Sequence, residues 1–134
     1  MEVKILTKEN YNEAMKIYAL CFEKPKRKIE LPLLGDLLGF YIDEELIGIA
    51  QIDYINNLFE NKKIAYINSF CIKNEYQNKG YGDLFFKKCI NYLKQKDVDK
   101  INLTSNKTRK YAHLLYKKND FEIIDTILLN KDLK

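Results

Sequence analysis

A short polar loop with two glycines contains the residues whose types and spacing best fit a chemical task. The loop reads Gln77, Asn78, Lys79, Gly80, Tyr81 and Gly82. An apolar run over residues 64–72 precedes it and an amphipathic segment follows it, so the loop is expected to join a strand to a helix. Backbone N–H groups at a helix start bind phosphate, and glycine lets a ligand approach closely. From these residues alone, the loop is either a phosphate site or a plain strand-to-helix turn.

Two other glycine loops are excluded by the spacing. The Walker A loop needs glycine, lysine and then serine or threonine, whereas Tyr81 follows Gly80 here. The dinucleotide fingerprint needs three glycines, and this loop has two. Neither a nucleoside triphosphate nor a nicotinamide cofactor is therefore expected.

The composition indicates a globular protein of one domain. The chain has 134 residues, 46% of them hydrophobic and 31% charged, so we expect a single domain over residues 1–134 with one core. A net charge of +4 favours anionic ligands. The basic run at residues 24–28 has no aromatic residues within it, so nucleic acid is not an expected partner. No signal peptide or membrane span is recognised, which predicts a cytoplasmic protein, either a monomer or a homodimer.

The cysteines and the single histidine give little to build a metal site from. Cys21, Cys71 and Cys89 each lie in apolar sequence and are predicted to be buried free thiols in a reducing compartment. The chain has no CxxC pair, so no metal is expected. We interpret His113 as a structural residue.

The elements that must position the loop can be read from periodicity. Strands are expected near residues 3–5, 38–42, 46–54, 64–72, 101–104 and 121–129, and helices over residues 11–22, about 82–96 and 109–118. Residues 29–38 are expected to form a short helix or turn. The predicted helix after the loop has an apolar stripe made of Phe86, Cys89, Ile90 and Leu93. This order predicts a mixed α/β fold, in which helices pack on a mixed sheet.

Two blocks of the sequence resemble one family. Residues 77–82 match the Q/R-x-x-G-x-G/A loop of the GCN5-related N-acetyltransferase (GNAT) family. A second block is similar to that family's other conserved region; it consists of Leu103, Thr104, Ser105, Asn106, Arg109, Ala112, His113, Tyr116, Lys118 and Phe121. The order of elements also fits, so the resemblance covers nearly the whole chain and implies the fold of the acyl-CoA N-acyltransferases.

The resemblance implies a role for each matched residue. The amides of the loop, Gln77 to Gly82, would hold the pyrophosphate of coenzyme A. The backbone of Cys71 and Ile72 would bind the pantetheine arm and the thioester carbonyl, where a donor stabilises the developing charge. Asn106 would contact the same arm. Tyr116 would act as the general acid that protonates the departing thiolate.

Two positions depart from the family pattern. Asp120 stands where a glycine usually precedes Phe121, so Asn119 or Asp120 must carry the left-handed backbone expected there. The strand before the loop has Asn68 and Ser69 where many members have a carboxylate. The general base is therefore open. It could be a water ordered by Ser69, by Asn68 or by a backbone carbonyl, or it could be a carboxylate such as Asp53 or Glu75.

The implied function is transfer of an acetyl group from acetyl-CoA to a primary amine, by direct attack in a ternary complex. The alternative is a catalytically weak acyl-CoA-binding module with a regulatory role, which the missing carboxylate favours. The acceptor could be a small-molecule amine, a peptide N-terminus or a protein lysine. Residues 22–38 and 56–63 are expected to shape its site.

Overall fold

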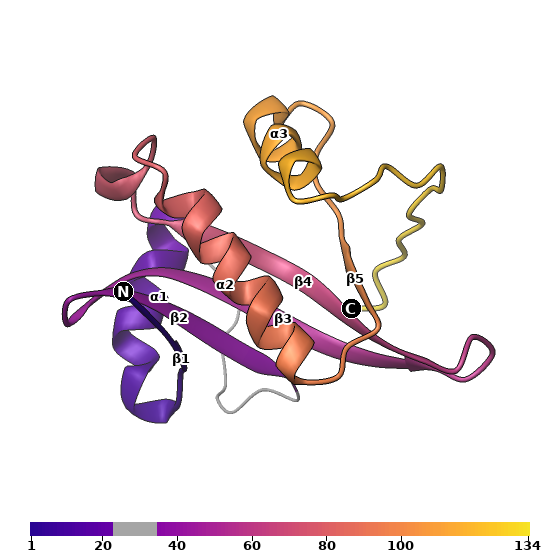
Figure 1. The fold of residues 1–134 in the computed structure, drawn as a ribbon, viewed down its shortest axis with the longest axis horizontal. Helices are drawn as coiled ribbons and strands as arrows, with labels where there is room; N and C mark the ends of the chain where they lie inside the picture. The colour runs from indigo at the N-terminus through magenta and orange to yellow at the C-terminus, as the bar shows by residue number, and fades with distance from the viewer. Residues whose placement is uncertain (23–34) are drawn as a thin grey trace. The chain divides into compact units, whose positions relative to one another are not determined.

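The computed structural model describes residues 1–22 and 35–134 (Figure 1). The chain divides into two compact units, Met1–Thr104 and Ser105–Lys134. In its described residues, the first unit is a five-stranded sheet with two α-helices and two short 3-10 helices. Its strands are β1 (Glu2–Ile5), β2 (Asp36–Ile42), β3 (Glu45–Asn57), β4 (Lys62–Ile72) and β5 (Lys100–Leu103). Its helices are η1 (Lys8–Asn10), α1 (Tyr11–Cys21), η2 (Asn74–Tyr76) and α2 (Tyr81–Gln95).

The sheet has its strands in chain order, β1-β2-β3-β4-β5. The first four pair antiparallel with their neighbours; short turns join β2 to β3 and β3 to β4, whereas α1 lies in the chain between β1 and β2. Strand β5 pairs parallel to β4 after the α2 crossover. In the turn between β2 and β3, Asp43 takes a positive φ of 53°, which aspartate tolerates better than most residues. The mixed sheet predicted from the sequence is therefore confirmed.

Helices α1 and α2 cover opposite faces of the sheet. Phe70 and Cys71 are neighbours on β4, so their side chains point to opposite faces. Phe70 packs against Phe86 of α2, with ring centroids 5.3 Å apart, whereas Cys71 is bonded to Cys21 of α1. The core therefore has two layers. On the α1 side it contains Leu6, Ala14, Ile17, Leu37, Leu46, Ile49 and Cys71.

Most predicted elements of the first unit are found, with longer strands than expected. Strands β2, β3 and β4 extend beyond the predicted ranges, and α1 ends at Cys21, one residue early. In α2 the fully buried residues are Phe85, Phe86, Cys89 and Leu93, whereas Ile90 is only half-buried. The short helix or turn predicted for residues 29–38 lies mostly outside the described residues; its last residues belong to β2.

The second unit contains one helix, α3 (Lys110–Lys118), and a C-terminal segment without a strand. The strand predicted for residues 121–129 is therefore wrong. Its apolar side chains are exposed, with Ile127 at 82% and Leu129 at 82%. Apolar β-branched residues favour a strand only where a neighbouring strand takes up their hydrogen bonds, and this unit has no strand in its described residues. Among the described helices of the chain, none is long and apolar enough to cross a bilayer.

Candidate active site

The end of β4 lies open on one side. Pairing between β4 and β5 stops at Ile67 and Leu103, whereas β4 continues along β3 to Ile72. Asn68 has no partner in the β3 register, because Gln51 pairs with Ser69 and Ile52 pairs with Ile67. Asn68 is thus the extra residue of a β-bulge, a device that bends a strand away from its neighbour and is common beside active sites. Within the described residues, 68–72 pair with β3 alone.

The backbone direction along this stretch decides which groups face the open side. The N–H of Lys73 donates to the carbonyl of Ile47, 2.8 Å away, and so points toward β3. Successive residues of a strand point their N–H and C=O groups to alternate sides, so those of Ile72 face away from β3. The carbonyl of Cys71 faces β3, because a Cβ built on Gly48 would lie 2.8 Å from its oxygen. The open-side backbone groups therefore belong to Ile72 and, two residues earlier, to Phe70.

Phe70 was missed by the sequence analysis, which named Cys71 and Ile72 for this role. The alternation of the strand was the signal that could have found it, because a donor at Ile72 implies another at position 70. Of the two residues named, Cys71 is the less suitable, because its backbone groups face β3.

The glycine loop joins β4 to α2 as predicted. The Gln77 side chain donates from Nε2 to the carbonyl of Ile72 at 2.8 Å and to Oδ1 of Asn74 at 3.2 Å. Gln77 therefore fastens the loop to the end of the strand. Gly80 takes a φ of +87° at the N-cap of α2, and only glycine adopts such a backbone without strain.

The start of α2 presents amides to open space. The first hydrogen bond of the helix runs from the N–H of Leu84 to the carbonyl of Gly80, at 3.2 Å. The amides of Tyr81 and Gly82 precede that bond and point out of the helix start. A Cβ built on Gly80 or Gly82 meets no atom within 4 Å, so a ligand can approach both residues closely. Together with the exposed cation of Lys79 and the positive end of the helix dipole, these groups fit an anionic ligand of pyrophosphate size.

In the second unit, Asn106 closes the turn that leads to α3. Its Oδ1 accepts hydrogen bonds from the backbone N–H of Thr108 at 3.0 Å and from the Thr108 hydroxyl at 2.8 Å. The side-chain oxygen is thus used to hold the turn, so a ligand contact by Asn106 would use its Nδ2 group.

Tyr116 is held in place by the C-terminal cap of α3. The N–H of Phe121 donates to the carbonyl of Tyr116 and the N–H of Asp120 to that of Lys117, each at 3.0 Å. These two bonds, with the ring centroids of Tyr116 and Phe121 6.1 Å apart, form a Schellman motif. Asp120 carries the left-handed backbone, with a φ of +67°, while Asn119 remains at −100°. Burial raises the pKa of Tyr116, and the charge of Arg109 offsets part of that shift, so the hydroxyl holds its proton at neutral pH.

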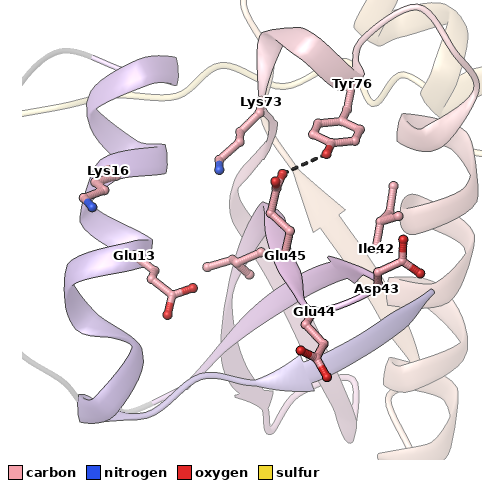
Figure 2. Close-up of a pocket in the computed structure, with 9 residues that line it drawn as sticks. Glu13, Lys16, Ile42, Asp43, Glu44, Glu45, Lys73 and Tyr76 are labelled. Carbon is pink, nitrogen blue, oxygen red and sulfur yellow. Dashed lines mark hydrogen bonds between the residues drawn. The ribbon is translucent and has the colours of Figure 1, made fainter.

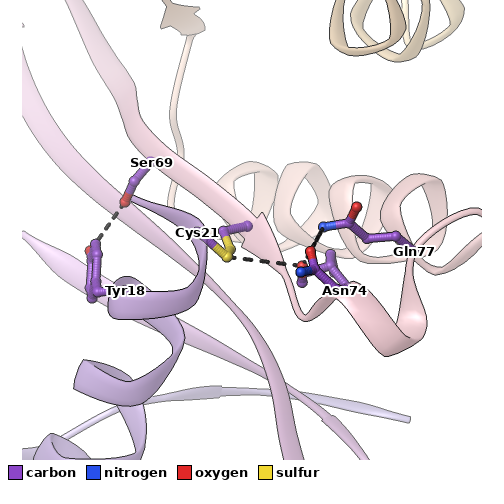
Figure 3. The surroundings of a disulfide bond; sticks show 7 residues. Tyr18, Cys21, Ser69, Asn74 and Gln77 are labelled. Atoms are coloured by element: carbon purple, nitrogen blue, oxygen red, sulfur yellow. Dashed lines mark hydrogen bonds between the residues drawn. A yellow bond between two sulfur atoms is a disulfide. The ribbon is translucent and has the colours of Figure 1, made fainter. Parts of the chain in front are cut away.

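The cysteines differ from the sequence prediction. Cys21 at the end of α1 and Cys71 on β4 form a disulfide, with their Cα atoms 6.3 Å apart (Figure 3). The prediction of free thiols is thus wrong for this pair, because α1 packs across β4 and brings together two residues 50 positions apart. Cys89 is the free thiol and is buried, as predicted, and this burial raises its pKa to about 12.

The candidate groups for the general base differ in their surroundings near β4. Asn68 donates from its side-chain amide to Oδ2 of Asp53, which brings this carboxylate to the bulge. Ser69 is half-buried and hydrogen-bonds Tyr18 of α1, with the two oxygens 3.1 Å apart. Glu75 lies on η2 and is exposed. The structure therefore places one carboxylate, that of Asp53, against the position where the family often has its own.

A separate hollow of about 590 Å³ lies between α1, the β2–β3 turn and the residues that follow β4 (Figure 2). Its lining consists of Glu13, Lys16, Ile42, Asp43, Glu44, Glu45, Leu46, Lys73 and Tyr76. The Tyr76 hydroxyl donates to Oε2 of Glu45 at 2.8 Å, which joins η2 to the turn. None of the loop residues 77–82 lines this hollow, so it is distinct from the anion site at the start of α2.

Comparisons with known structures show the same fold in several proteins, two of which are acetyltransferases. An aminoglycoside acetyltransferase from an uncultured soil metagenomic sample, crystallised with sisomicin, is 14% identical with a TM-score of 0.82, over 99% of this chain and 96% of that chain. A ribosomal-protein-alanine N-acetyltransferase from Brucella melitensis biovar Abortus 2308 is 11% identical with a TM-score of 0.82, over 98% and 100% of the two chains. A transcriptional regulator from Bacillus halodurans C-125 is 19% identical with a TM-score of 0.81, over 98% and 99%.

A search of curated proteins finds no match in sequence to this chain. The model of the acetyltransferase (GNAT) family, however, matches residues 7–121, which include β4, the glycine loop, α2 and α3. The chain therefore belongs to the GNAT acetyltransferase family.

Proposed function

We propose that this protein transfers an acetyl group from acetyl-CoA to a primary amine by direct attack in a ternary complex. The observation that carries the proposal is the junction of β4 and α2, where open-side backbone groups of Ile72 adjoin a helix start with Gly80 in the left-handed conformation. This junction suits a ligand that has a carbonyl at one end and a pyrophosphate at the other.

Acetyl-CoA would supply the activated acetyl group. The amides of residues 77–82 would bind its pyrophosphate, the N–H of Ile72 would donate to its thioester oxygen, and Nδ2 of Asn106 would contact its pantetheine arm. The amine nitrogen forms a bond to the thioester carbon, the carbon–sulfur bond breaks, and the thiolate takes a proton from Tyr116. The proton lost by the amine goes to a base or water on the acceptor side. Residues 1–134 would work as one catalytic domain.

An amine acceptor is supported by the structural neighbours, one an aminoglycoside acetyltransferase and another a ribosomal-protein-alanine N-acetyltransferase. Those two acceptors differ in size and class, so they do not select between a small molecule and a peptide for this chain.

The second candidate is a catalytically weak acyl-CoA-binding module. It is favoured by one observation, the absence of a carboxylate at Asn68 and Ser69 on β4. Release of free thiol from acetyl-CoA, measured with a panel of primary amines, separates the two. The panel would contain spermidine, an aminoglycoside, a lysine-containing peptide and an alanine-initiated peptide. Turnover with one of these amines is the expected result, whereas heat of acetyl-CoA binding without thiol release from any amine would favour the module.

A further inference from the structure

A row of polar side chains interrupts the apolar layer between α1 and the sheet. Gln51 on β3 and Ser69 on β4 are paired across the two strands, and Tyr18 of α1 reaches both. Figure 3 shows the Tyr18 hydroxyl directed at Ser69. The three side chains are half-buried, so the row borders solvent rather than lying sealed in the core.

The chemistry of these groups fixes the direction of their hydrogen bonds. Oε1 of Gln51 can only accept, so the single proton of the Tyr18 hydroxyl is donated to it, across 3.3 Å. Ser69 must then donate to the Tyr18 oxygen, across 3.1 Å. The lone pairs of the Ser69 oxygen remain as acceptors, so this end of the row is suited to receive an N–H group.

A negative charge lies beside the row. Asp53 follows Gln51 by two residues on β3 and therefore points to the same face of the sheet. Burial raises the pKa of Tyr18; the hydrogen bond from Ser69 lowers it in part, and the carboxylate of Asp53 raises it further. Tyr18 thus keeps its proton at neutral pH, and the direction of the row is preserved.

The row is close to the group proposed to bind the thioester. Ser69 precedes Ile72 by three residues on the same strand, which is about 10 Å between Cα atoms at the rise of a β-strand. Cys71, on the same face as Ser69, lies about 7 Å from it along the strand. The Ser69 end of the row and the proposed thioester site therefore belong to the same stretch of β4.

We propose that Ser69, oriented by Tyr18 and Gln51, binds the N–H of the acceptor amine, and that Asp53 attracts this acceptor in its ammonium form. The inference rests on the proposed function and adds the acceptor side of the same site. Ser69 is the binding residue, and Tyr18 and Gln51 are positioning residues. The acceptor class that this arrangement recognises is a primary amine that is cationic at neutral pH.

The test is steady-state kinetics of Ser69→Ala and Tyr18→Phe with the best amine of the panel above. Ser69→Ala is expected to raise the KM for the amine about tenfold, the effect of losing a hydrogen bond to a charged group. Tyr18→Phe is expected to raise the KM for the amine by a smaller factor, because Tyr18 only orients Ser69. Both should leave the KM for acetyl-CoA unchanged. Ser69→Thr keeps the hydroxyl and should retain a KM near that of the wild type. Asp53→Asn should also raise the KM for cationic amines.

A matched control is Tyr92→Phe, which removes a tyrosine hydroxyl that donates to Oδ2 of Asp36 at 2.8 Å. Tyr92 lies on α2, which packs on the opposite face of the sheet, so neither KM should change.

An unchanged amine KM in Ser69→Ala and Tyr18→Phe of an active enzyme would overturn the inference and leave the proposed function standing. A rise in both KM values would also overturn it, because it would indicate a distorted strand. Absence of thiol release in the wild type would instead remove the proposed function and the inference together. Tyr18→Phe leaves the strand sequence intact and decides the question if Ser69→Ala does not fold.

Discussion

The side-chain amide of Gln77 donates a hydrogen bond of 2.8 Å to the backbone carbonyl of Ile72. One residue of the glycine loop is thereby fixed to the last residue of β4, so the spacing between the two halves of the proposed acetyl-CoA site depends on this bond. A side chain at position 77 must be able to donate a hydrogen bond in order to preserve it.

Gln77→Glu is expected to raise the KM for acetyl-CoA about tenfold or more. A carboxylate cannot donate to the Ile72 carbonyl, and it places a negative charge beside the pyrophosphate. Gln77→Arg keeps a donor and should remain within a few-fold of the wild type. The measurement is thiol release over a range of acetyl-CoA concentrations at saturating amine. Equal KM values for the two variants would show that the loop does not depend on this bond.

Tyr116→Phe is expected to lower kcat about 100-fold, the size of effect typical for loss of a general acid, with little change in the KM for acetyl-CoA. Burial keeps the Tyr116 hydroxyl protonated at neutral pH, so it has a proton to give to the thiolate. Tyr111 on the same helix is exposed, and Tyr111→Phe serves as the matched control with unchanged kcat. Turnover of Tyr116→Phe at the wild-type rate would remove Tyr116 from the mechanism.

The two blocks that resemble the family's motifs could be read from the sequence because the residues of each block are close in the chain. The loop residues 77–82 follow one strand and begin one helix, and local spacing is enough to place them. The position of Asp120 was also foreseen as one of two candidates for a left-handed residue, and the structure selects it. Local rules of backbone conformation decide such features.

The remaining features depend on contacts between distant segments. The Cys21–Cys71 disulfide and the row of Tyr18, Gln51 and Ser69 exist because α1 lies across β3 and β4, and no spacing in the sequence encodes that contact. The bulge at Asn68 is a property of the β3–β4 register rather than of β4 itself. In the C-terminal segment a missing contact decides the outcome. Residues 121–129 have the composition of a strand, but the described residues of their unit contain no strand with which they could pair.

Thiol counting should give one thiol per chain after unfolding without reductant and three after reduction, because Cys21 and Cys71 are bonded and Cys89 is free. In the folded protein at pH 8, Cys89 should not react with a thiol reagent, since burial raises its pKa to about 12 and excludes the reagent. Cys89→Ala is the control and should give no thiol after unfolding without reductant. Three thiols before reduction would show that the pair is reduced in the isolated protein.

Alkaline pH should destabilise the fold through Tyr54 and Tyr92, which both donate to Oδ2 of Asp36, at 2.6 and 2.8 Å. Burial, followed by the hydrogen bond and negative charge of Asp36, raises the pKa of both hydroxyls above their usual value of 10.0. The folded state therefore keeps these protons at pH values where the unfolded chain releases them. Their contribution to stability is complete below pH 10 and is lost as the pH rises above it.

Urea denaturation between pH 8 and pH 11 measures this loss. The double variant Tyr54→Phe/Tyr92→Phe has lost both hydrogen bonds to Asp36 and should be less stable than the wild type at pH 8. It should also lose less of its free energy of unfolding between pH 8 and pH 11, because two groups with raised pKa values are gone. Other tyrosines titrate equally in both proteins, so the difference between the two pH dependences isolates this pair. Parallel pH dependences would show that the hydroxyls of Tyr54 and Tyr92 do not retain their protons in the folded state.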